Sequence, residues 1–321
     1  MIKVQRGGCA VKLAFQIILL AIGFAMLAKG ADWFVDGASA AARRLGIPQM
    51  VIALTVVAMG TSAPELAVSL SAALRGDLDM SVGSIVGSNI LNILIILGVC
   101  SMVTDLDAAR STIRAEIPFM LLVTAVLQLQ GSSRSAGRGR GVVLLLLFAI
   151  YIGYIIRMAK KGRAEVTVES PGDPPLGRCA LMTVVGLVLI IWGSSITVDM
   201  ASGVARQFGL SERFIGLTIV ALGTSLPELF TSLNAALKGN ADIALGNIVG
   251  SNIFNILFIA GLSGLVVPSS FANLYVADTL VAVAAAAVLA GFCIRKGKLV
   301  TWHGAVMLTG YGVYLGWLLM R

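Results

Sequence analysis

The sequence predicts an all-α polytopic membrane protein with ten transmembrane helices in two inverted five-helix repeats. Three observations predict it: 58% of the 321 residues are hydrophobic and 12% are charged, the apolar residues form ten long runs, and one segment recurs 163 residues later. Soluble domains contain roughly 25% charged residues, so an ordinary soluble enzyme is excluded. The formal net charge of +8 comes mostly from short loops between the runs. Lys and Arg set membrane topology there, and no nucleic-acid partner is expected.

A transmembrane helix needs about 20 predominantly apolar residues. Five runs lie in a first repeat at 1–156, and five lie in a second repeat at 179–321. A polar segment at 157–178, which contains a Pro-Gly-Asp-Pro-Pro stretch, links the two repeats. The runs are Leu13–Ala42, Ile47–Leu74, Met80–Thr104, Ile117–Ser133, Gly141–Ile156, Cys179–Val198, Phe214–Leu237, Ile243–Pro268, the residues after Asp278, and Leu299–Met320.

The internal repeat is the most informative feature of the chain. Gly60–Gly98 and Gly223–Gly261 align without a gap and are identical at 25 of 39 positions. Because each half has an odd number of spans, the second half must cross the membrane in the opposite sense. Inverted repeats of this kind are common in secondary transporters, whose sites lie near the membrane midplane. The distribution of Lys and Arg over the loops favours an N-terminus outside the cytoplasm.

Glu65 and Glu228 occupy equivalent positions, each deep inside an apolar run. A carboxylate there costs about 2.5 kcal/mol or more to insert, so we interpret both as functional. Each ends a Gly-Thr-Ser-x-Pro-Glu motif, and proline removes a backbone donor. We therefore expect free carbonyls at 58–62 and 221–225, beside the motif hydroxyls. These oxygens suit Ca²⁺ and the similarly sized Na⁺. The absence of His and Cys from the motifs excludes a zinc or copper site.

A second motif, Gly83–Asn92, recurs as Gly246–Asn255. Its serine and second asparagine are spaced i, i+4 and so share one helix face. They either join helices by hydrogen bonds or bind the ion, and their recurrence beside the glutamates favours ion binding.

Together the motifs, GTSxPE followed by GxIVGSNIxN and present twice, resemble those of the sodium/calcium exchanger branch of the cation/Ca²⁺ antiporter superfamily. The resemblance covers nearly the whole chain, with the two family repeats at 58–98 and 221–261. It implies that both glutamates are the central Ca²⁺ ligands. It also implies that the motif hydroxyls, an alanine carbonyl one turn earlier, and the second-motif Ser and Asn complete the Ca²⁺ and Na⁺ sites. The implied residues are Glu65, Glu228, Thr61, Ser62, Thr224, Ser225, Ser88, Ser251, Asn92, Asn255, Ala58 and Ala221.

The resemblance further implies an antiporter in a prokaryotic cytoplasmic (inner) membrane that exchanges about three Na⁺ for one Ca²⁺ by alternating access. It implies no enzymatic activity, no cofactor and no partner besides the ions and the lipid bilayer, a monomer being sufficient. Asn255 stands where K⁺-dependent relatives carry aspartate, which argues against K⁺ co-transport. The runs bearing Asp36 and Asp199 resemble the family's gating helices. We place these two aspartates at the membrane interface and not among the ion ligands.

Alternatives remain open at this point. Ca²⁺/H⁺ exchange is compatible with the same fold, because burial disfavours the charged form of a carboxylate and so favours proton uptake. A passive cation channel is disfavoured by a narrow, duplicated site. An intramembrane hydrolase using Ser62 or Ser225 would need an activating base, and neither motif contains His or Lys. The four cysteines, without metal-binding spacing, are expected as free thiols, and His303 as a satisfied or interfacial side chain.

Overall fold

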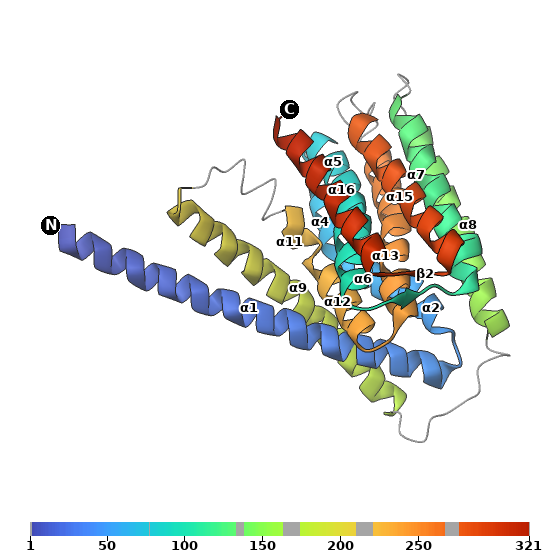
Figure 1. Cartoon of the computed structure of the whole chain (residues 1–321), viewed down its shortest axis with the longest axis horizontal. Helices are drawn as coiled ribbons and strands as arrows, with labels where there is room; N and C mark the ends of the chain where they lie inside the picture. Colours follow the sequence, from blue (N-terminus) through green and yellow to red (C-terminus); the bar gives the residue numbers. More distant parts are fainter. Residues whose placement is uncertain are drawn as a thin grey trace.

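The computed structural model describes residues 2–76, 78–132, 138–162, 174–209, 221–266 and 276–320. Parts of four sequence predictions lie outside these residues: the middle of the 157–178 linker, the start of the 214–237 run, the end of the 243–268 run, and the loop after the fourth run. In the described residues the chain is nearly all helical. A bundle of roughly aligned helices is crossed obliquely by two long ones, as Figure 1 shows.

Both described halves of the chain are series of helices, several of them interrupted by short π-helical stretches, labelled η. The first half contains α1 (Ile2–Leu45), α2 (Gln49–Ile52), η1 (Ala53–Val57), α3 (Ala58–Thr61), α4 (Ala63–Leu74), α5 (Leu78–Leu91), η2 (Asn92–Leu97), α6 (Gly98–Val103), β1 (Leu106–Asp107), η3 (Thr112–Glu116), α7 (Ile117–Ser132) and α8 (Gly139–Gly162). The second contains α9 (Leu176–Gln207), α11 (Ala221–Thr224), α12 (Leu226–Leu237), α13 (Ala241–Phe254), η5 (Asn255–Ile259), α14 (Ala260–Val266), α15 (Val276–Lys296), β2 (Lys298–Leu299) and α16 (Thr301–Met320).

The sequence repeat is also a repeat of structural elements. The bounds of α3, α4 and α5 coincide with those of α11, α12 and α13 at the same offset of 163 residues. Seven described helices are long and apolar enough to cross a membrane, and the bent pair Gln49–Thr61 and Ala63–Leu74 makes an eighth. The helices reach further than the apolar runs, since α8 continues to Gly162 and α9 begins at Leu176. Both ends of the expected 157–178 linker are therefore helical.

The chain bends by 50° where α3 gives way to α4. The expectation of free carbonyls across this break is wrong at its two ends. The Ser62 amide donates to the Ala58 carbonyl at 3.1 Å, and the Leu66 amide donates to the Ser62 carbonyl at 3.1 Å. The reason is the position of Pro64 in the first turn of α4. Backbone amides have no intrahelical partner there, so proline removes little.

The second break differs from the first at its beginning and matches it at its end. The Ser225 amide donates to the Leu222 carbonyl at 3.2 Å, and the Ser225 carbonyl accepts from the Leu229 amide at 3.0 Å. The missing amide of Pro227 removes the bond to the carbonyl four residues earlier, that of Gly223. This carbonyl instead accepts the Ser194 hydroxyl of α9 at 2.6 Å. The break is thus stabilised by a helix outside the repeat motif.

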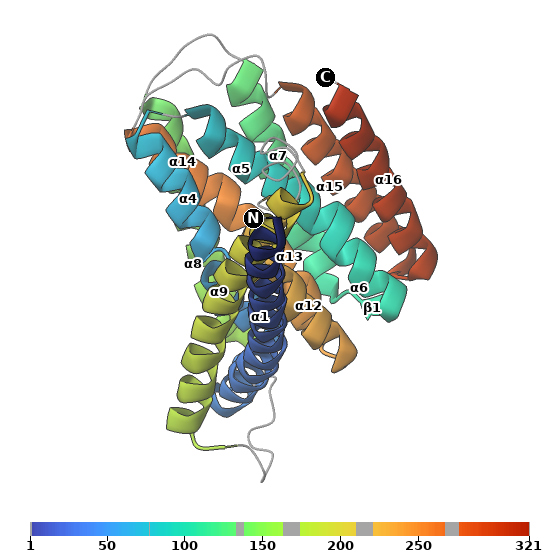
Figure 2. The same ribbon diagram turned by 90° about the vertical axis from the view of Figure 1, so that its left-hand side faces the viewer.

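The two long helices α1 and α9 lie side by side in contact, as Figures 1 and 2 show. A Cβ placed on Gly30 would lie 2.8 Å from the Gly186 carbonyl oxygen, and one on Gly186 would lie 2.7 Å from that of Gly30. Gly23 and Gly193 make the equivalent pair, with a Cβ on Gly193 2.9 Å from the Gly23 oxygen. Small residues at such spacing let helix backbones approach closely in membranes, and here no side chain separates the two backbones.

The centre of the bundle is α13, which packs against η1, α3 and α12. Its residues from Ile243 to Phe254 are all buried. In the span that contains α13, 94% of the most apolar 18-residue segment is buried inside the protein. In α1 the buried share of the corresponding segment is 22%. The polar residues of the second motif on α13 therefore lie in the protein core, whereas the most apolar segment of α1 is largely exposed.

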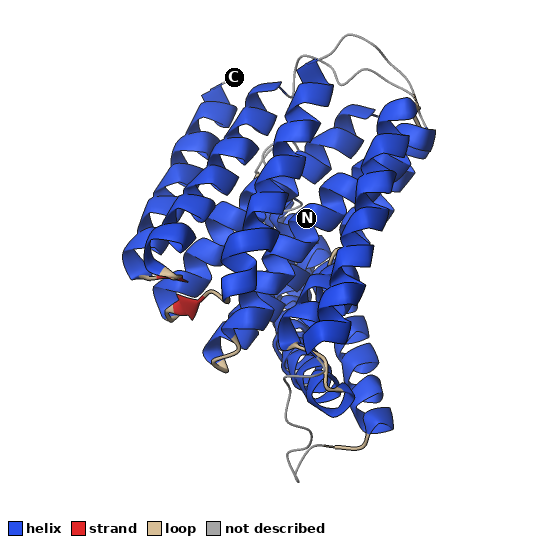
Figure 3. Cartoon of the chain, turned by 90° about the vertical axis from the view of Figure 1, so that its right-hand side faces the viewer, coloured by secondary structure: helices blue, strands red, loops and turns tan. Residues whose placement is uncertain are grey.

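A two-stranded antiparallel sheet was not expected from the sequence. Leu106 of β1 pairs with Leu299 of β2, and Asp107 pairs with Lys298. The sheet lies at one end of the bundle, next to the start of α16, where Figure 3 shows a strand in red. Lys298 also forms an ion pair with Asp105 at 2.6 Å. The hydrogen bond to this carboxylate raises the pKa of Lys298 above its ordinary value. Two residues per strand are too few to produce a recognisable alternation in sequence.

Two smaller predictions are confirmed. The prediction of free thiols is confirmed for Cys100, Cys179 and Cys293, while the side chain of Cys9 lies outside those that the structure describes. His303 is 1% exposed and its Nδ1 accepts the Val300 amide at 3.2 Å. Its ring stacks on Phe292 with the centroids 4.1 Å apart. The buried imidazole of His303 is therefore held by contacts with its neighbours, as expected for a satisfied side chain.

Candidate ion-binding site

Glu65 and Glu228 are brought into one site at the beginnings of α4 and α12. Their residues are 1% and 0% exposed, respectively. Each carboxylate accepts a hydrogen bond from a serine of the opposite half. The Ser62 hydroxyl donates to Glu228 Oε1 at 2.8 Å, and the Ser225 hydroxyl donates to Glu65 Oε1 at 3.3 Å. The predicted pairing of the two motifs is thus direct and reciprocal.

The serines do not play the part that their local sequence suggests. Ser62 and Ser225 precede their glutamates by three residues, a spacing that typically forms a capping box at a helix start. Both serines do occupy the N-cap position, but neither makes a side-chain capping bond. Each hydroxyl instead points across to the other half of the protein. The Ser-x-x-Glu spacing, which usually marks a local helix cap, here provides a contact between segments about 160 residues apart in the sequence.

Each glutamate keeps one oxygen available. Within the described part of the chain, Oε2 of Glu65 and Oε2 of Glu228 have no hydrogen-bond partner. A buried polar atom without a partner costs about 1–3 kcal/mol, and more for a charged group. Two such oxygens in one site are therefore an arrangement that a bound cation would stabilise.

Threonine hydroxyls and an alanine carbonyl lie beside the carboxylates. The Thr61 hydroxyl is 3.1 Å from Asn247 Oδ1 and 3.4 Å from the Ala58 carbonyl oxygen. The Ser251 hydroxyl donates to the same Ala58 carbonyl at 3.3 Å. Thr61 and Ser251 both lie against Glu228, as Thr224 lies against Glu65. The structure thus brings these motif residues together with the glutamates.

The second-motif asparagines complete the polar core. Asn92 is 1% exposed and Asn255 is 0% exposed, and Ser88 is buried one turn before Asn92. Asn92 begins η2 and Asn255 begins η5, while η1 ends directly before Ala58. Single π-helical turns occur frequently at functional sites. The predicted ligands therefore lie on α3, α4, α5, η2, α11, α12, α13 and η5, and Ser62 and Ser225 lie at the junctions of α3 with α4 and of α11 with α12.

Sequence reasoning did not single out three buried asparagines of this core. Asn89 and Asn252 are 3% and 1% exposed, and Asn247 is fully buried. The Asn247 amide donates to the Ser232 hydroxyl at 2.9 Å while its oxygen faces Thr61. Asn89 and Asn252 carried a usable signal, because both copies of the repeat retain them. Asn247 did not, because its counterpart at position 84 is a serine.

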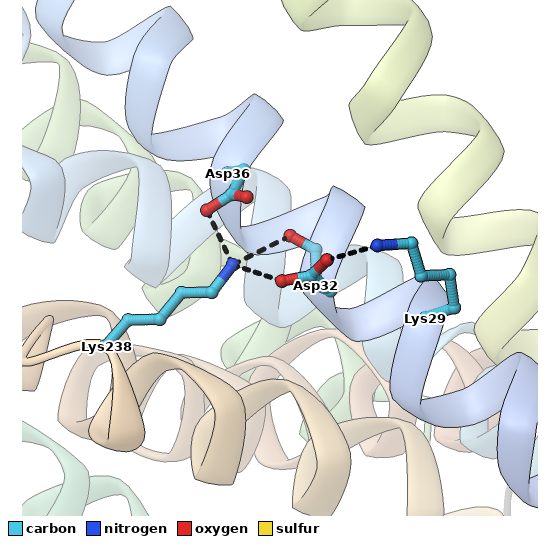
Figure 4. A network of polar contacts seen from close by, with 4 residues as sticks. All are labelled: Lys29, Asp32, Asp36 and Lys238. Carbon is cyan, nitrogen blue, oxygen red and sulfur yellow. Dashed lines mark hydrogen bonds and ion pairs between the residues drawn. The ribbon is translucent and has the colours of Figure 1, made fainter.

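Asp36 and Asp199 are exposed and do not join the glutamates. As Figure 4 shows, Lys238 lies between Asp36 and Asp32, with an ion pair of 2.6 Å to each, and Lys29 pairs with Asp32 at 2.7 Å. Partial burial lowers the pKa of Lys238, but the hydrogen bonds to Asp32 and Asp36 raise it more, so its pKa stands above the ordinary value. These charges join α1 to the end of α12. The described residues contain no group of three or more His, Cys, Asp or Glu able to hold a metal ion.

Comparisons with known proteins identify the family of this chain. The family model described as sodium/calcium exchanger protein matches residues 15–157 and 179–320. CaxA of Alkalimonas amylolytica is 40% identical over 289 residues, which cover 88% of this chain and 91% of CaxA. Inner membrane protein YrbG of Escherichia coli (strain K12) is 36% identical over 311 residues, covering 94% and 95%. A solved structure of the sodium-calcium exchanger NCX_Mj superposes with a TM-score of 0.82 at 29% identity, over 94% of this chain and 98% of that one. The chain belongs to the sodium/calcium exchanger family.

Proposed function

We propose that this chain is a secondary antiporter that exchanges Na⁺ for Ca²⁺ by alternating access at the site between Glu65 and Glu228. One observation carries the proposal. Two carboxylates of a membrane protein are fully buried, each receives a hydroxyl from the opposite half, and each keeps one oxygen without a partner among the described residues. Membrane proteins retain buried carboxylates mainly on ion and substrate pathways.

The donor set supports hard cations. Every side chain assigned to the site offers carboxylate, hydroxyl or amide oxygen, and the alanines offer carbonyls. Ca²⁺ takes 6–8 oxygen ligands in flexible geometry. The assigned ligands are Glu65, Glu228, Thr61, Ser62, Thr224, Ser225, Ser88, Ser251, Asn92, Asn255, Ala58 and Ala221. The ions are the cargo of this site, and no cofactor is required.

The charge of the site supports electrogenic, K⁺-independent exchange. Two carboxylates balance one Ca²⁺, whereas three Na⁺, the number taken from the family, leave the loaded site with one positive charge. Asn255 contributes a neutral amide and so does not add a third carboxylate for a further monovalent ion. Competition of both ions for the same two glutamates would enforce strict exchange.

We further propose that the chain crosses the membrane ten times in two inverted repeats. Reciprocal contacts support a twofold relation between the halves, because the serine–glutamate and the asparagine contacts from the first half to the second each have a counterpart in the opposite direction. Inverted repeats give transporters two related ways of closing around one fixed site. We place the protein in a prokaryotic inner membrane with the N-terminus outside, and a monomer contains the complete site.

Ca²⁺/H⁺ exchange is the second candidate, and one observation favours it. Both carboxylates are removed from water, which favours their protonated form. In that reading, two protons would replace Na⁺ at the same oxygens. The fold, the inverted repeats and the ligand residues would be unchanged, so only the coupling ion separates the two candidates.

Uptake of radiolabelled Ca²⁺ into proteoliposomes tests the proposal. Vesicles are loaded with Na⁺ at equal internal and external pH, or given an outward H⁺ gradient without Na⁺, with and without external K⁺. We expect uptake with the Na⁺ gradient alone, independent of K⁺ and accompanied by current. Uptake driven only by H⁺ would contradict Na⁺ coupling and support the second candidate. Uptake in neither condition would contradict Ca²⁺ transport.

A further inference from the structure

Four asparagines form a reciprocal network at the centre of the protein. The Asn89 side-chain amide donates to the Asn252 backbone carbonyl at 3.4 Å, and the Asn252 side-chain amide donates to the Asn89 backbone carbonyl at 3.3 Å. The Asn92 amide donates to Asn252 Oδ1 at 3.0 Å, and the Asn255 amide donates to Asn89 Oδ1 at 3.2 Å. All four residues are at most 3% exposed. Each bond therefore has an equivalent in the other half.

The network determines which end of each amide points where. A backbone carbonyl only accepts hydrogen bonds, so Asn89 and Asn252 must direct their NH₂ groups at it. Their own oxygens then face the other two asparagines. Asn92 and Asn255 must therefore direct their NH₂ groups at those oxygens. The orientation of an asparagine amide is assigned from its hydrogen-bond network. Here the network begins at the backbone carbonyls of Asn89 and Asn252, and because these can only accept, one orientation of each amide is possible.

The consequence is that two amide oxygens remain available. Within the described residues, Asn92 Oδ1 and Asn255 Oδ1 have no hydrogen-bond partner, like Oε2 of Glu65 and Oε2 of Glu228. Two equivalent pairs of residues thus provide four buried oxygens without a partner in the described part of the chain. An amide turned the other way would present two N–H donors to a cation and repel it.

We propose that Asn89 and Asn252 are positioning residues that hold the amide oxygens of Asn255 and Asn92, respectively, toward the transported cation. The positioning is crossed, since Asn252 of the second half orients Asn92 of the first, and Asn89 orients Asn255. This inference rests on the proposed function, because it presumes that Asn92 and Asn255 bind the ion. It adds two residues that touch no ion and still determine the affinity for it.

A physical reason links the loss of either positioning residue to weaker binding. In Asn252→Ala the NH₂ group of Asn92 loses its acceptor in a buried site, where an unpaired donor is costly. Unpartnered carboxylate oxygens offer it an alternative acceptor in the same core. The cation would then have to displace this bond before binding. We expect the Ca²⁺ affinity to fall about tenfold, the effect of one neutral hydrogen bond.

Double-mutant cycles provide the test, because they separate action through a ligand from general destabilisation. The single variants are Asn252→Ala, Asn89→Ala, Asn92→Ala and Asn255→Ala. The four double variants combine each positioning residue with each ligand asparagine, so that two pairs lie across the halves and two lie within a half. Binding is read as the thermal stabilisation of purified protein by Ca²⁺, Na⁺, Sr²⁺ and Mn²⁺, which depends on affinity through the ligand concentration. In proteoliposomes, the KM for Ca²⁺ and the maximal rate are measured separately.

We expect Asn252→Ala to have no further effect on affinity once Asn92 is alanine, and the same for Asn89→Ala once Asn255 is alanine. The combinations Asn252 with Asn255, and Asn89 with Asn92, are the matched controls and should be additive. The KM should rise with little change in the maximal rate. If the alanine variants do not fold, serine variants repeat the cycle, since a serine hydroxyl is satisfied within its own helix.

The outcomes distinguish this inference from the proposed function. Additive effects in all four combinations, or coupling within each half instead of across the halves, would overturn the crossed positioning while leaving Na⁺/Ca²⁺ exchange intact. Stabilisation by cations without Na⁺-driven Ca²⁺ uptake would overturn the exchange reaction, and the cycles would still report on the positioning. An unsubstituted chain that no cation stabilises would overturn both.

Discussion

Replacing Glu65 by glutamine removes one charge from the site and little else. Glutamine has nearly the same shape and can still accept the hydrogen bond that Ser225 donates. The side chain is 1% exposed, so water does not compensate for the lost charge. The same reasoning applies to Glu228→Gln. Both substitutions therefore test the charge of the carboxylate and not its volume.

The size of the effect follows from electrostatics. At an effective dielectric constant of about 20, unit charges 4 Å apart attract by about 4 kcal/mol, and a divalent ion doubles this to about 8 kcal/mol. If the cost of dehydrating the carboxylate offsets half of the attraction, about 4 kcal/mol remains, which is a loss of about a thousandfold in Ca²⁺ affinity. We expect Ca²⁺ uptake at micromolar Ca²⁺ to be abolished.

Glu116 provides the matched control. Like Glu65 it is 1% exposed, accepts one hydroxyl, that of Tyr154 at 2.6 Å, and keeps Oε2 without a partner among the described residues. It differs in its place, because it belongs to η3, outside the ligand set. Glu116→Gln should retain the affinity for Ca²⁺. Uptake and Ca²⁺-induced thermal stabilisation are measured for both variants. If Glu65→Gln keeps its affinity within tenfold, or if Glu116→Gln loses as much, the assignment of the site is refuted.

Three further predictions concern the ion count, the long helices and the surface charges. Asn255→Asp adds a third carboxylate and should make Ca²⁺ uptake sensitive to K⁺ or change the charge moved per Ca²⁺; unchanged values of both would show that the amide is only structural. Gly186→Ala places a Cβ 2.6 Å from a backbone nitrogen of α1 and should cost about 1–3 kcal/mol of stability and reduce transport. Gly153→Ala, with no atom within 4 Å, is its control, and equal melting temperatures would contradict the close packing. Lys238→Gln breaks partly exposed ion pairs and should cost about 0.5–1 kcal/mol at low salt. This loss should fade at high salt, where charges are screened, and a salt-independent shift of the melting temperature would contradict the electrostatic role.

The sequence predicted those features that occur in both halves or that are unusual in a membrane span, such as a charged residue within an apolar run. Glu65 and Glu228 were recognisable because a carboxylate in an apolar run is costly, and its duplication excludes accident. The helix breaks were also predictable from proline, but the fate of the carbonyls was not. Whether a carbonyl stays free depends on the exact position of Pro64 in the new helix and on neighbours such as Ser194. The short sheet was missed because two residues per strand carry no periodic signal.

The reciprocal contacts explain why the site itself could not be derived from either half. A serine three residues before a glutamate predicts a local cap, and a serine–asparagine pair four residues apart predicts a shared helix face. In the structure, residues of both patterns make contacts across the two halves: the Ser62 hydroxyl donates to Glu228, and the Asn92 amide donates to Asn252. Each half therefore supplies acceptors that the other half must satisfy. A single half would leave its glutamate without the hydroxyl that now binds it, and its second-motif asparagine without a fixed orientation. We infer that duplication of the motif is a requirement of the site's chemistry, because the serine–glutamate bonds and the bonds of the Asn92 and Asn255 amides are made between the copies.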